Sequence, residues 1–347
     1  MKKRKLKRSV KIILFTMIFS LVGVLVMRYF KLDEKINNYL IQNNINFKTF
    51  IIEKPKVKII DTDSKTRPIA VSINNNHSAW PLSGLQNAYL VYELIAEGGI
   101  TRLLAFYKDA NVSKIGSIRS TRHYFLDYVL ENDAIFVHYG QSPQAKIDLE
   151  ELNIDNINGM YDYKPFTRDT SLRRSYEHTA FSSTKKINET IKDKKYRTQT
   201  DRLLLEYNPV KVKLPENAIK ATDISLEYSS YQTTSYKYNE EKRVYELYMD
   251  NKKQKDLVTK ETYTVKNIIV YQVEIETIDS KDRQDLKNIS SGKGYYITNG
   301  QAIEIKWEKE SRESKTTYTH KDGSPLIVND GNTWIHITPK NKKIIIN

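Results

Sequence analysis

The sequence predicts one N-terminal transmembrane helix, followed by an α/β domain with a mixed sheet and then by a β-rich second domain. Three observations predict this fold class. A cationic N-terminus precedes a long uncharged apolar run, strand and helix patterns alternate after it, and only strand and turn patterns remain from about Pro215 onward. We therefore expect a cytoplasmic basic tail (1–11), a transmembrane signal-anchor (12–30), a tether (31–66), an α/β N-terminal domain (67–214) and a β-rich C-terminal domain (215–347).

The anchor follows from charge and length. The first eleven residues contain seven Lys or Arg, and the run from Ile12 to Met27 contains no charged residue. As a helix this run spans roughly 24 Å of a hydrocarbon core of about 30 Å, and Lys11 and Arg28 can reach the two interfaces. The cationic tail should stay in the cytoplasm, which places the rest of the chain outside the cell membrane. A cleaved signal peptide is the alternative, but no small-x-small cleavage site follows the run.

Composition excludes several classes of protein. The chain has no cysteine, so disulfides, thiol catalysis and attachment through a lipidated cysteine are ruled out. Most of the basic character lies in the tail, because 56 Lys and Arg less those seven leave 49, against 42 Asp and Glu. An excess this small is insufficient for a nucleic-acid-binding face, although it favours attraction to an anionic envelope surface.

Strand and helix patterns place the elements of the N-terminal domain. Strands are expected at 69–73, 89–95 and 100–107, the last two joined by a hairpin through Gly98 and Gly99; a single helix from Leu85 to Ile95 is the alternative. A β-α-β unit follows, with strands at 114–118 and 134–139 and a helix between them. The expected helices are capped at Ser120, at Ser142 with Pro143, and at Ser182 or Ser183, and they run to about Glu131, Glu151 and Lys194.

The C-terminal domain shows strand patterns at 221–228, 243–249 and 267–278. Asn299-Gly300 lies between two such runs and is typical of a type I′ hairpin turn. Nothing in this half indicates its chemistry.

Arginines and hydroxyls gather in the segment Ile118–Arg122. Arg119, Ser120, Thr121 and Arg122 are expected at a helix N-terminus, where free amide groups, the helix dipole and two guanidiniums suit a phosphate or a carboxylate. The alternative is a capped helix whose arginines form structural ion pairs with Glu93 or Glu97.

A second polar group follows the next strand, at His138, Gln141 and Ser142. Loops after the carboxyl ends of strands line the ligand crevice of an α/β sheet, so the two groups are expected to share one cleft. His138 is then a candidate general base or hydrogen-bond donor; the alternative is that it only satisfies a backbone carbonyl.

A third polar group lies in a long loop that contains Arg168, Arg174 and His178. A solvated basic loop is expected there, and closure over an anionic ligand is the alternative. The candidate ligand-binding residues are Arg102, Arg119, Ser120, Thr121, Arg122, His138, Gln141, Ser142 and His178. Glu93 and Glu97 are a further candidate acid–base pair, for glycoside cleavage. No metal-binding or cofactor-binding motif is present, so none is expected, and no catalytic residue is assigned.

Several motifs resemble the YerB-type family of bacterial envelope proteins. They are Arg67–Asn74, Ser83–Leu85, Val91–Glu93, Glu97–Arg102, Ile115–Arg122 and Val137–Ala145 in the first domain, and Gly292–Tyr295, Asn299-Gly300, Trp307 and Gly331–Ile335 in the second. The resemblance runs from about Arg67 to Pro339 and implies a two-domain surface lipoprotein whose molecular activity is unassigned. This chain departs from that pattern, because a signal-anchor replaces the lipidated cysteine; the side of the membrane is expected to be the same.

Two hypotheses follow from these features. The first is a non-catalytic module that binds an anionic wall polymer, a lipid-linked precursor or a partner protein at the outer membrane surface. The second is an envelope enzyme acting on a phosphate-containing or glycan polymer. It rests on an analogy with the LytR-CpsA-Psr phosphotransferases. Residues Ser117–Thr121 of this chain loosely resemble the arginine motif of those enzymes.

Overall fold

The computed structural model describes residues 55–347, which form one compact unit. The predicted tail and signal-anchor, and the tether up to residue 54, lie outside the described residues. Within residues 55–347, no helix is long and apolar enough to cross a membrane.

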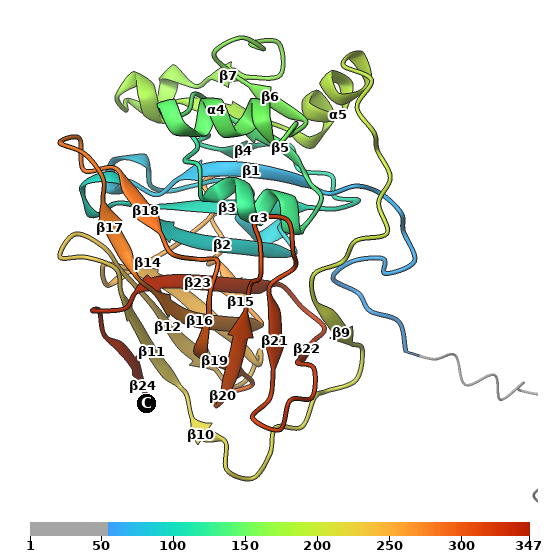
Figure 1. Cartoon of the computed structure of the whole chain (residues 1–347), viewed down its shortest axis with the longest axis vertical. Helices are drawn as coiled ribbons and strands as arrows, with labels where there is room; N and C mark the ends of the chain where they lie inside the picture. Colours follow the sequence, from blue (N-terminus) through green and yellow to red (C-terminus); the bar gives the residue numbers. More distant parts are fainter. Residues whose placement is uncertain (1–54) are drawn as a thin grey trace, which may run out of the picture. The chain divides into compact units, whose positions relative to one another are not determined.

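One mixed sheet runs through both halves of this unit (Figure 1). In spatial order its strands are β10 (Ile219–Lys220), β20 (Gln301–Glu308), β19 (Ser291–Thr298), β16 (Asn267–Val273), β23 (Thr333–Pro339), β2 (Leu90–Ile95), β3 (Thr101–Tyr107), β1 (Ile69–Asn74), β5 (Ile135–His138) and β6 (Asn156–Asn158), and β21 (Thr317–Thr319) pairs with β20. The junction between the two halves is the parallel pair β2–β23. The predicted α/β and β-rich halves therefore share a sheet, and the boundary between 214 and 215 stays a prediction.

Smaller sheets surround the main one. One of them is a six-stranded antiparallel sheet. Five of its strands lie in the spatial order β14 (Lys252–Lys253), β13 (Val244–Met249), β12 (Thr233–Asn239), β11 (Asp223–Glu227) and β24 (Ile344–Ile346), and the sixth, β15 (Thr264–Val265), pairs with β13. Two pairs are β17 (Ile275–Thr277) with β18 (Gln284–Leu286), and β22 (Ile327–Asn329) with β9 (Glu206–Asn208). A three-stranded sheet contains β4 (Ile115–Gly116), β8 (Ala180–Ser182) and β7 (Thr167–Arg168).

The α-helices of the described residues all come from the N-terminal half: α3 (Phe125–Glu131), α4 (Pro143–Glu151) and α5 (Thr184–Asp193). Two predicted caps are confirmed, because Ser142 Oγ accepts a hydrogen bond from the amide of Ala145 and Ser183 Oγ accepts one from Lys186. The cap predicted at Ser120 is wrong. The helix begins five residues later, since the Ser120 hydroxyl instead donates to the carbonyl of Tyr139 at 3.0 Å.

The expected β-α-β unit is also only partly present. The strand predicted at 114–118 is reduced to β4, which pairs with β8 and lies outside the main sheet. The chain after it crosses the ends of β1 and β5. The amide of Arg119 donates to Ser72 at 2.9 Å, and the carbonyl of Arg119 accepts from Tyr139 at 3.0 Å. These two backbone bonds fix the start of the arginine segment at the carboxyl edge of the sheet.

Both predicted hairpins are confirmed. β2 and β3 pair antiparallel around the 3-10 turn η3 (Glu97–Gly99), so the alternative of a single helix over 85–95 is wrong. β19 and β20 pair around Asn299 and Gly300, whose φ angles of 52° and 77° are those of a type I′ turn. The strand predicted at 267–278 is divided into β16 and β17, with Glu274 between them.

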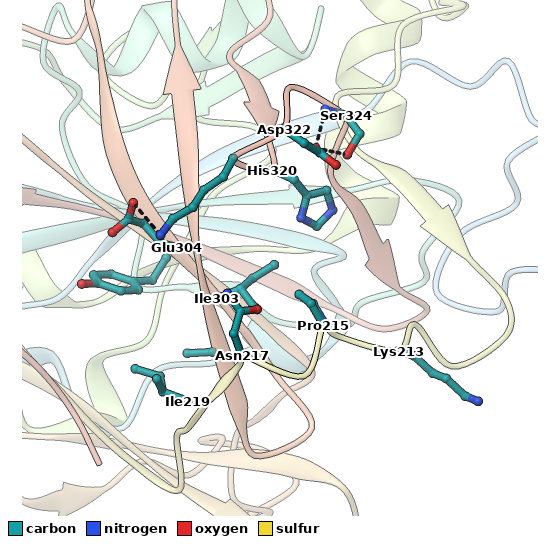
Figure 2. A pocket seen from close by; sticks show the side chains of 12 residues that line it. Lys213, Pro215, Asn217, Ile219, Ile303, Glu304, His320, Asp322 and Ser324 are labelled. Carbon is teal, nitrogen blue, oxygen red and sulfur yellow. Dashed lines mark hydrogen bonds and ion pairs between the residues drawn. The ribbon is translucent and has the colours of Figure 1, made fainter.

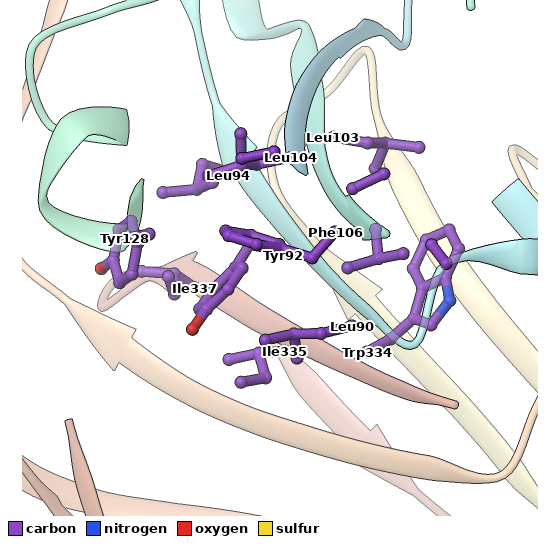
Figure 3. Close-up of a cluster of buried hydrophobic side chains, with 14 of the residues drawn as sticks. Leu90, Tyr92, Leu94, Leu103, Leu104, Phe106, Tyr128, Trp334, Ile335 and Ile337 are labelled. Carbon is purple, nitrogen blue, oxygen red and sulfur yellow. The ribbon is translucent and has the colours of Figure 1, made fainter. Parts of the chain in front are cut away.

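The core lies where β2, β3 and β23 pack side by side (Figure 3). Every residue of these three strands is buried, as expected for central strands covered on both faces. Leu90, Tyr92 and Phe106 from the first half meet Trp334 and Ile335 from the second. The same runs contain Glu93, Arg102 and His336, and a charged or polar side chain at such depth requires partners.

Candidate functional site

Two arginines bind one glutamate where β2 ends and β3 begins. Glu97 lies in η3, and the φ angles of 61° and 73° at Gly98 and Gly99 allow the chain to reverse there. Arg102 Nη2 donates to Glu97 Oε2 at 3.2 Å, and Arg122 Nε donates to the other carboxylate oxygen. The ion pairs that the sequence left as an alternative are therefore present, with Glu97 as the shared acid.

The electrostatics of this cluster leave Arg102 incompletely compensated. Burial opposes the ionisation of Glu97, but the hydrogen bond from Arg122 and the two guanidinium charges outweigh it, and the pKa of Glu97 lies below its usual value. Burial, together with the charge of Arg122, lowers the pKa of Arg102 to about 10. Arg102 is only 7% exposed, and its Nη1 has no hydrogen-bond partner. An unpaired buried polar group typically costs about 1–3 kcal/mol of stability. A ligand atom that accepts a hydrogen bond from Nη1 would remove this cost.

Arg119 is more exposed than Arg102 and Arg122, the two arginines that bind Glu97. Its side chain is 31% exposed, and its nearest carboxylate oxygen is Glu177 Oε1, 4.0 Å from Nη2. Burial is the main cause that lowers the pKa of Arg119; the charges of Arg122 and Arg168 lower it further, whereas those of Glu177 and Glu97 raise it. An anion bound beside Arg119 would offset the cost of burying its charge.

Arg168 is held flat between two aromatic rings. Its guanidinium carbon lies 4.3 Å from the ring centroid of Tyr139 and 4.0 Å from that of Tyr176. Its Nη1 donates to the carbonyl of Tyr176 at 2.7 Å, while its buried Nε has no partner. We call Arg102, Arg119, Arg122 and Arg168, together with Glu97 and Glu177, the arginine edge. It contains four guanidiniums and two carboxylates.

His178 lies beside this edge. Its Nδ1 is 2.7 Å from Asn74 Nδ2 at the end of β1, and its Nε2 is 3.9 Å from Glu177 Oε1. Burial and the positive charge of Arg119 lower the pKa of His178, which favours the neutral imidazole at neutral pH. His178 is therefore placed to accept or donate a hydrogen bond at the edge without adding charge.

The remaining candidates position this edge. Thr121 donates its amide to Gly140 at 3.0 Å, Gln141 Oε1 accepts from Asn158 Nδ2 at 2.6 Å, and Ser142 caps α4. With Ser120 bonded to Tyr139, these contacts join the arginine segment to the loop after β5. The two polar groups therefore meet at one sheet edge, through a segment that crosses the strand ends, while the single cleft that they were expected to share stays a prediction. The helix N-terminus proposed as an anion site at Ser120 is not there.

His138 lies apart from the edge. It is fully buried, with Nδ1 2.9 Å from the carbonyl of Gly140 and Nε2 3.2 Å from Asn156 Oδ1. Burial lowers the pKa of His138. Both ring nitrogens thus face protein oxygens, which agrees with the alternative of a histidine that satisfies a backbone carbonyl, and we leave His138 out of the proposed site.

Sequence reasoning missed the partner of Glu93. Glu93 is fully buried, and its Oε2 lies 3.2 Å from Nδ1 of His336, which is equally buried. Glu97 is bound to arginines at the edge, so the two glutamates face different surroundings and do not form an acid–base pair. The sequence did contain a signal for this contact: His336 lies within the buried strand β23, and a buried histidine requires a polar partner.

One cavity reaches the arginine edge: its volume is 400 Å³, and Arg168 lines it together with Lys114 and Lys186. The largest of five cavities described for residues 55–347 has a volume of 660 Å³ and is lined by His320, Asp322 and Ser324, among others (Figure 2). These three residue types suggest a catalytic triad, but Ser324 Oγ donates to Asp322 Oδ1 at 2.6 Å within a tight turn, so the geometry is that of a turn. Arg119, Arg122 and His138 line none of the five. Within residues 55–347, no group of three or more His, Asp or Glu is placed to hold a metal ion.

Comparison with known proteins identifies relatives over most of the chain. Residues 57–197 match the model described as "Protein of unknown function (DUF3048) N-terminal domain", and residues 224–335 match the corresponding C-terminal domain. The chain is 33% identical over 281 residues to a Bacillus subtilis (strain 168) protein named "Putative lipoprotein YerB", covering 80% of this chain and 82% of that protein. The crystal structure of YerB from Bacillus subtilis is similar, with a TM-score of 0.71 and 30% identity over 81% of this chain and 94% of that one.

Proposed function

Because this chain belongs to the two-domain DUF3048 family, of which YerB is a member, we propose that it is an envelope protein that binds an anionic ligand at the arginine edge. The name of the relative supports a place at the membrane surface. In this chain the helix expected at 12–30 supplies the attachment, with the N-terminus in the cytoplasm and residues 55–347 outside. Wall polymers and lipid-linked precursors are the anionic ligands that such a location offers.

The observation that carries the proposal is the incomplete pairing of guanidiniums at the edge. Arg102 and Arg122 share the carboxylate of Glu97. Arg102 retains a buried Nη1 without a partner, and Arg119 has no carboxylate oxygen nearer than 4.0 Å. In a purely structural cluster, buried charges are expected to be paired. A phosphate or carboxylate between Arg119 and Arg168 would accept several charge-assisted hydrogen bonds.

Binding, rather than catalysis, is the function that these contacts support. His178 lies beside the edge, whereas His138 and Glu93 are buried among protein groups, with His138 Nδ1 at the carbonyl of Gly140 and Glu93 beside His336. The phosphotransferase analogy rested on a strand-end arginine motif, but Ser117–Thr121 follows β4, a two-residue strand outside the main sheet. An anion held by guanidiniums needs none of these groups.

The experiment is a titration of residues 55–347 with inorganic pyrophosphate at low salt. Arg119→Ala should weaken binding about tenfold or more, since a charge-assisted hydrogen bond contributes about 1.5–3 kcal/mol. Lys192→Ala, which removes one positive charge from the exposed face of α5, is the matched control and should leave affinity within about twofold, because an exposed distant charge is screened. Equal affinity in the parent and the Arg119→Ala protein, with both folded, would refute the proposal.

A further inference from the structure

We infer that the arginine edge continues into a tyrosine platform that stacks sugar rings, so that the ligand class is an anionic glycan. This inference rests on the proposed function and adds to it the identity of the polymer backbone. The platform is formed by Tyr139, Tyr161, Tyr163 and Tyr176.

Exposed aromatic rings are confined to one segment of the described chain. Among residues 55–347, the exposed Tyr, Phe and Trp side chains are Tyr161, Tyr163 and Tyr176, at 66%, 73% and 66% exposure. Met160 beside them is also exposed. Large apolar side chains gathered on one part of a surface usually mark a binding site, whereas single exposed ones need no explanation.

Contacts connect this segment to the arginine edge. Tyr176 and Tyr139 both contact the guanidinium of Arg168, so the two rings and the guanidinium form one packed layer of contacts, with centroid distances of 4.0 and 4.3 Å. Tyr139 in turn lies against Gly159, where an added Cβ would come within 2.2 Å of its ring. The close approach therefore requires glycine and places the following Met160–Tyr163 loop beside the layer.

The same loop also approaches the arginine segment. A Cβ built at Gly140 would lie 3.8 Å from Met160 Cγ and 2.9 Å from Ser120 Oγ. Gly140 therefore lies between the tyrosine loop and the residue that follows Arg119. The loop that carries Tyr161 and Tyr163 and the segment that carries Arg119 therefore both reach Gly140, beyond the carboxyl end of β5.

The chemistry of this surface suits a sugar that carries an acidic group. A tyrosine ring presents an apolar face with a polar rim, which matches the apolar face and hydroxyl rim of a pyranose ring. The planar guanidiniums of Arg119 and Arg168 suit a phosphate or carboxylate attached to that ring. Glu177, which is half exposed beside Arg119, is an acceptor for sugar hydroxyls.

A membrane surface is the competing partner, and the residue types favour the glycan. Helices and loops that insert into a bilayer interface carry Trp, Phe and Leu together with Lys or Arg. Every exposed Tyr, Phe or Trp side chain of residues 55–347 is a tyrosine.

Two anionic probes distinguish binding through a sugar ring from binding through the anionic group alone. Residues 55–347 form one compact unit, and this fragment is titrated with an oligogalacturonate, in which each sugar ring carries a carboxylate, and with inorganic polyphosphate, which has no ring. Tyr176→Ala should weaken oligogalacturonate binding about fivefold more than polyphosphate binding, the size of one lost aromatic stacking contact, because any loss of the hold on Arg168 affects both probes alike. Tyr176→Phe keeps the ring and should bind both probes like the parent. The backbone carbonyl that holds Arg168 remains in both variants.

The outcomes distinguish this inference from the proposed function. If Arg119→Ala loses polyphosphate while Tyr176→Ala keeps full oligogalacturonate affinity, the glycan inference is overturned and the anion site stands. The glycan inference is also overturned if the parent binds polyphosphate only, or if Tyr176→Ala reduces binding to phosphatidylglycerol vesicles but not to oligogalacturonate. If neither probe binds the parent, both proposals fail.

Discussion

Glu93 and His336 face each other in the parallel pair of β2 and β23, with Glu93 Oε2 3.2 Å from His336 Nδ1 and both side chains fully buried. Hydroxyl groups complete the network. Thr101 and Thr234 donate to Glu93 Oε1 at 2.7 and 2.9 Å, and the hydroxyls of Tyr228 and Tyr236 lie 2.9 and 2.8 Å from the two ring nitrogens of His336. This polar network joins the first half of the chain to the second.

Glu93→Ala should destabilise the protein by several kcal/mol, because the buried hydroxyls of Thr101 and Thr234 lose their acceptor and each unpaired buried polar group costs about 1–3 kcal/mol. Urea unfolding of residues 55–347 measures this change. The double variant Glu93→Ala/His336→Ala should cost less than the sum of the two single changes. Additive losses would mean that the two residues act independently, contrary to the network seen here.

The N-terminal half should not fold alone. A fragment of residues 55–214 would lack β23 and expose the edge of β2 with Glu93, and it would also lose Lys309, whose Nζ lies 3.0 Å from Glu131 Oε2 with both side chains fully buried. We expect a circular dichroism melt without a cooperative transition. A cooperative melt of that fragment would show that the halves are independent domains.

The stability of residues 55–347 should fall as the pH decreases from 7 to 5.5, and His138 should contribute to the loss. Burial lowers the pKa of His138 below its usual value near 6.5, so below that pH the unfolded chain binds a proton that the folded chain does not. The contribution of one such histidine is at most about 1.4 kcal/mol per pH unit. His138→Gln should reduce this slope in urea unfolding at several pH values. An unchanged slope would show that His138 is not the titrating group.

The elements predicted most accurately carry local signals. Ser142 and Pro143 start α4 at the expected residue, and Asn299 with Gly300 closes the expected hairpin, since cap and turn chemistry depend on neighbouring residues alone. Ser120 has the same cap chemistry but bonds to Tyr139, a partner 19 residues away. A local pattern cannot anticipate such a competing partner.

The candidate site was predictable in composition but not in arrangement. Arg119, Arg122 and Arg102 were identified from their residue types. Arg102 and Arg122 are brought together by ion pairs with Glu97, which lies in the glycine turn between β2 and β3. The pairing of Glu93 with His336 joins positions 243 apart in the sequence, and the tyrosine platform depends on exposure, which a sequence pattern does not reveal.

The most direct test is the location of the bound anion, measured by amide chemical shifts of residues 55–347 titrated with inorganic pyrophosphate. We expect the largest changes at Ser120, Gln141 and Glu177, around the guanidiniums of Arg119 and Arg168, and we expect Arg119→Ala to abolish them. Changes confined to another surface, such as the 660 Å³ cavity around His320, would contradict an anion site at the arginine edge.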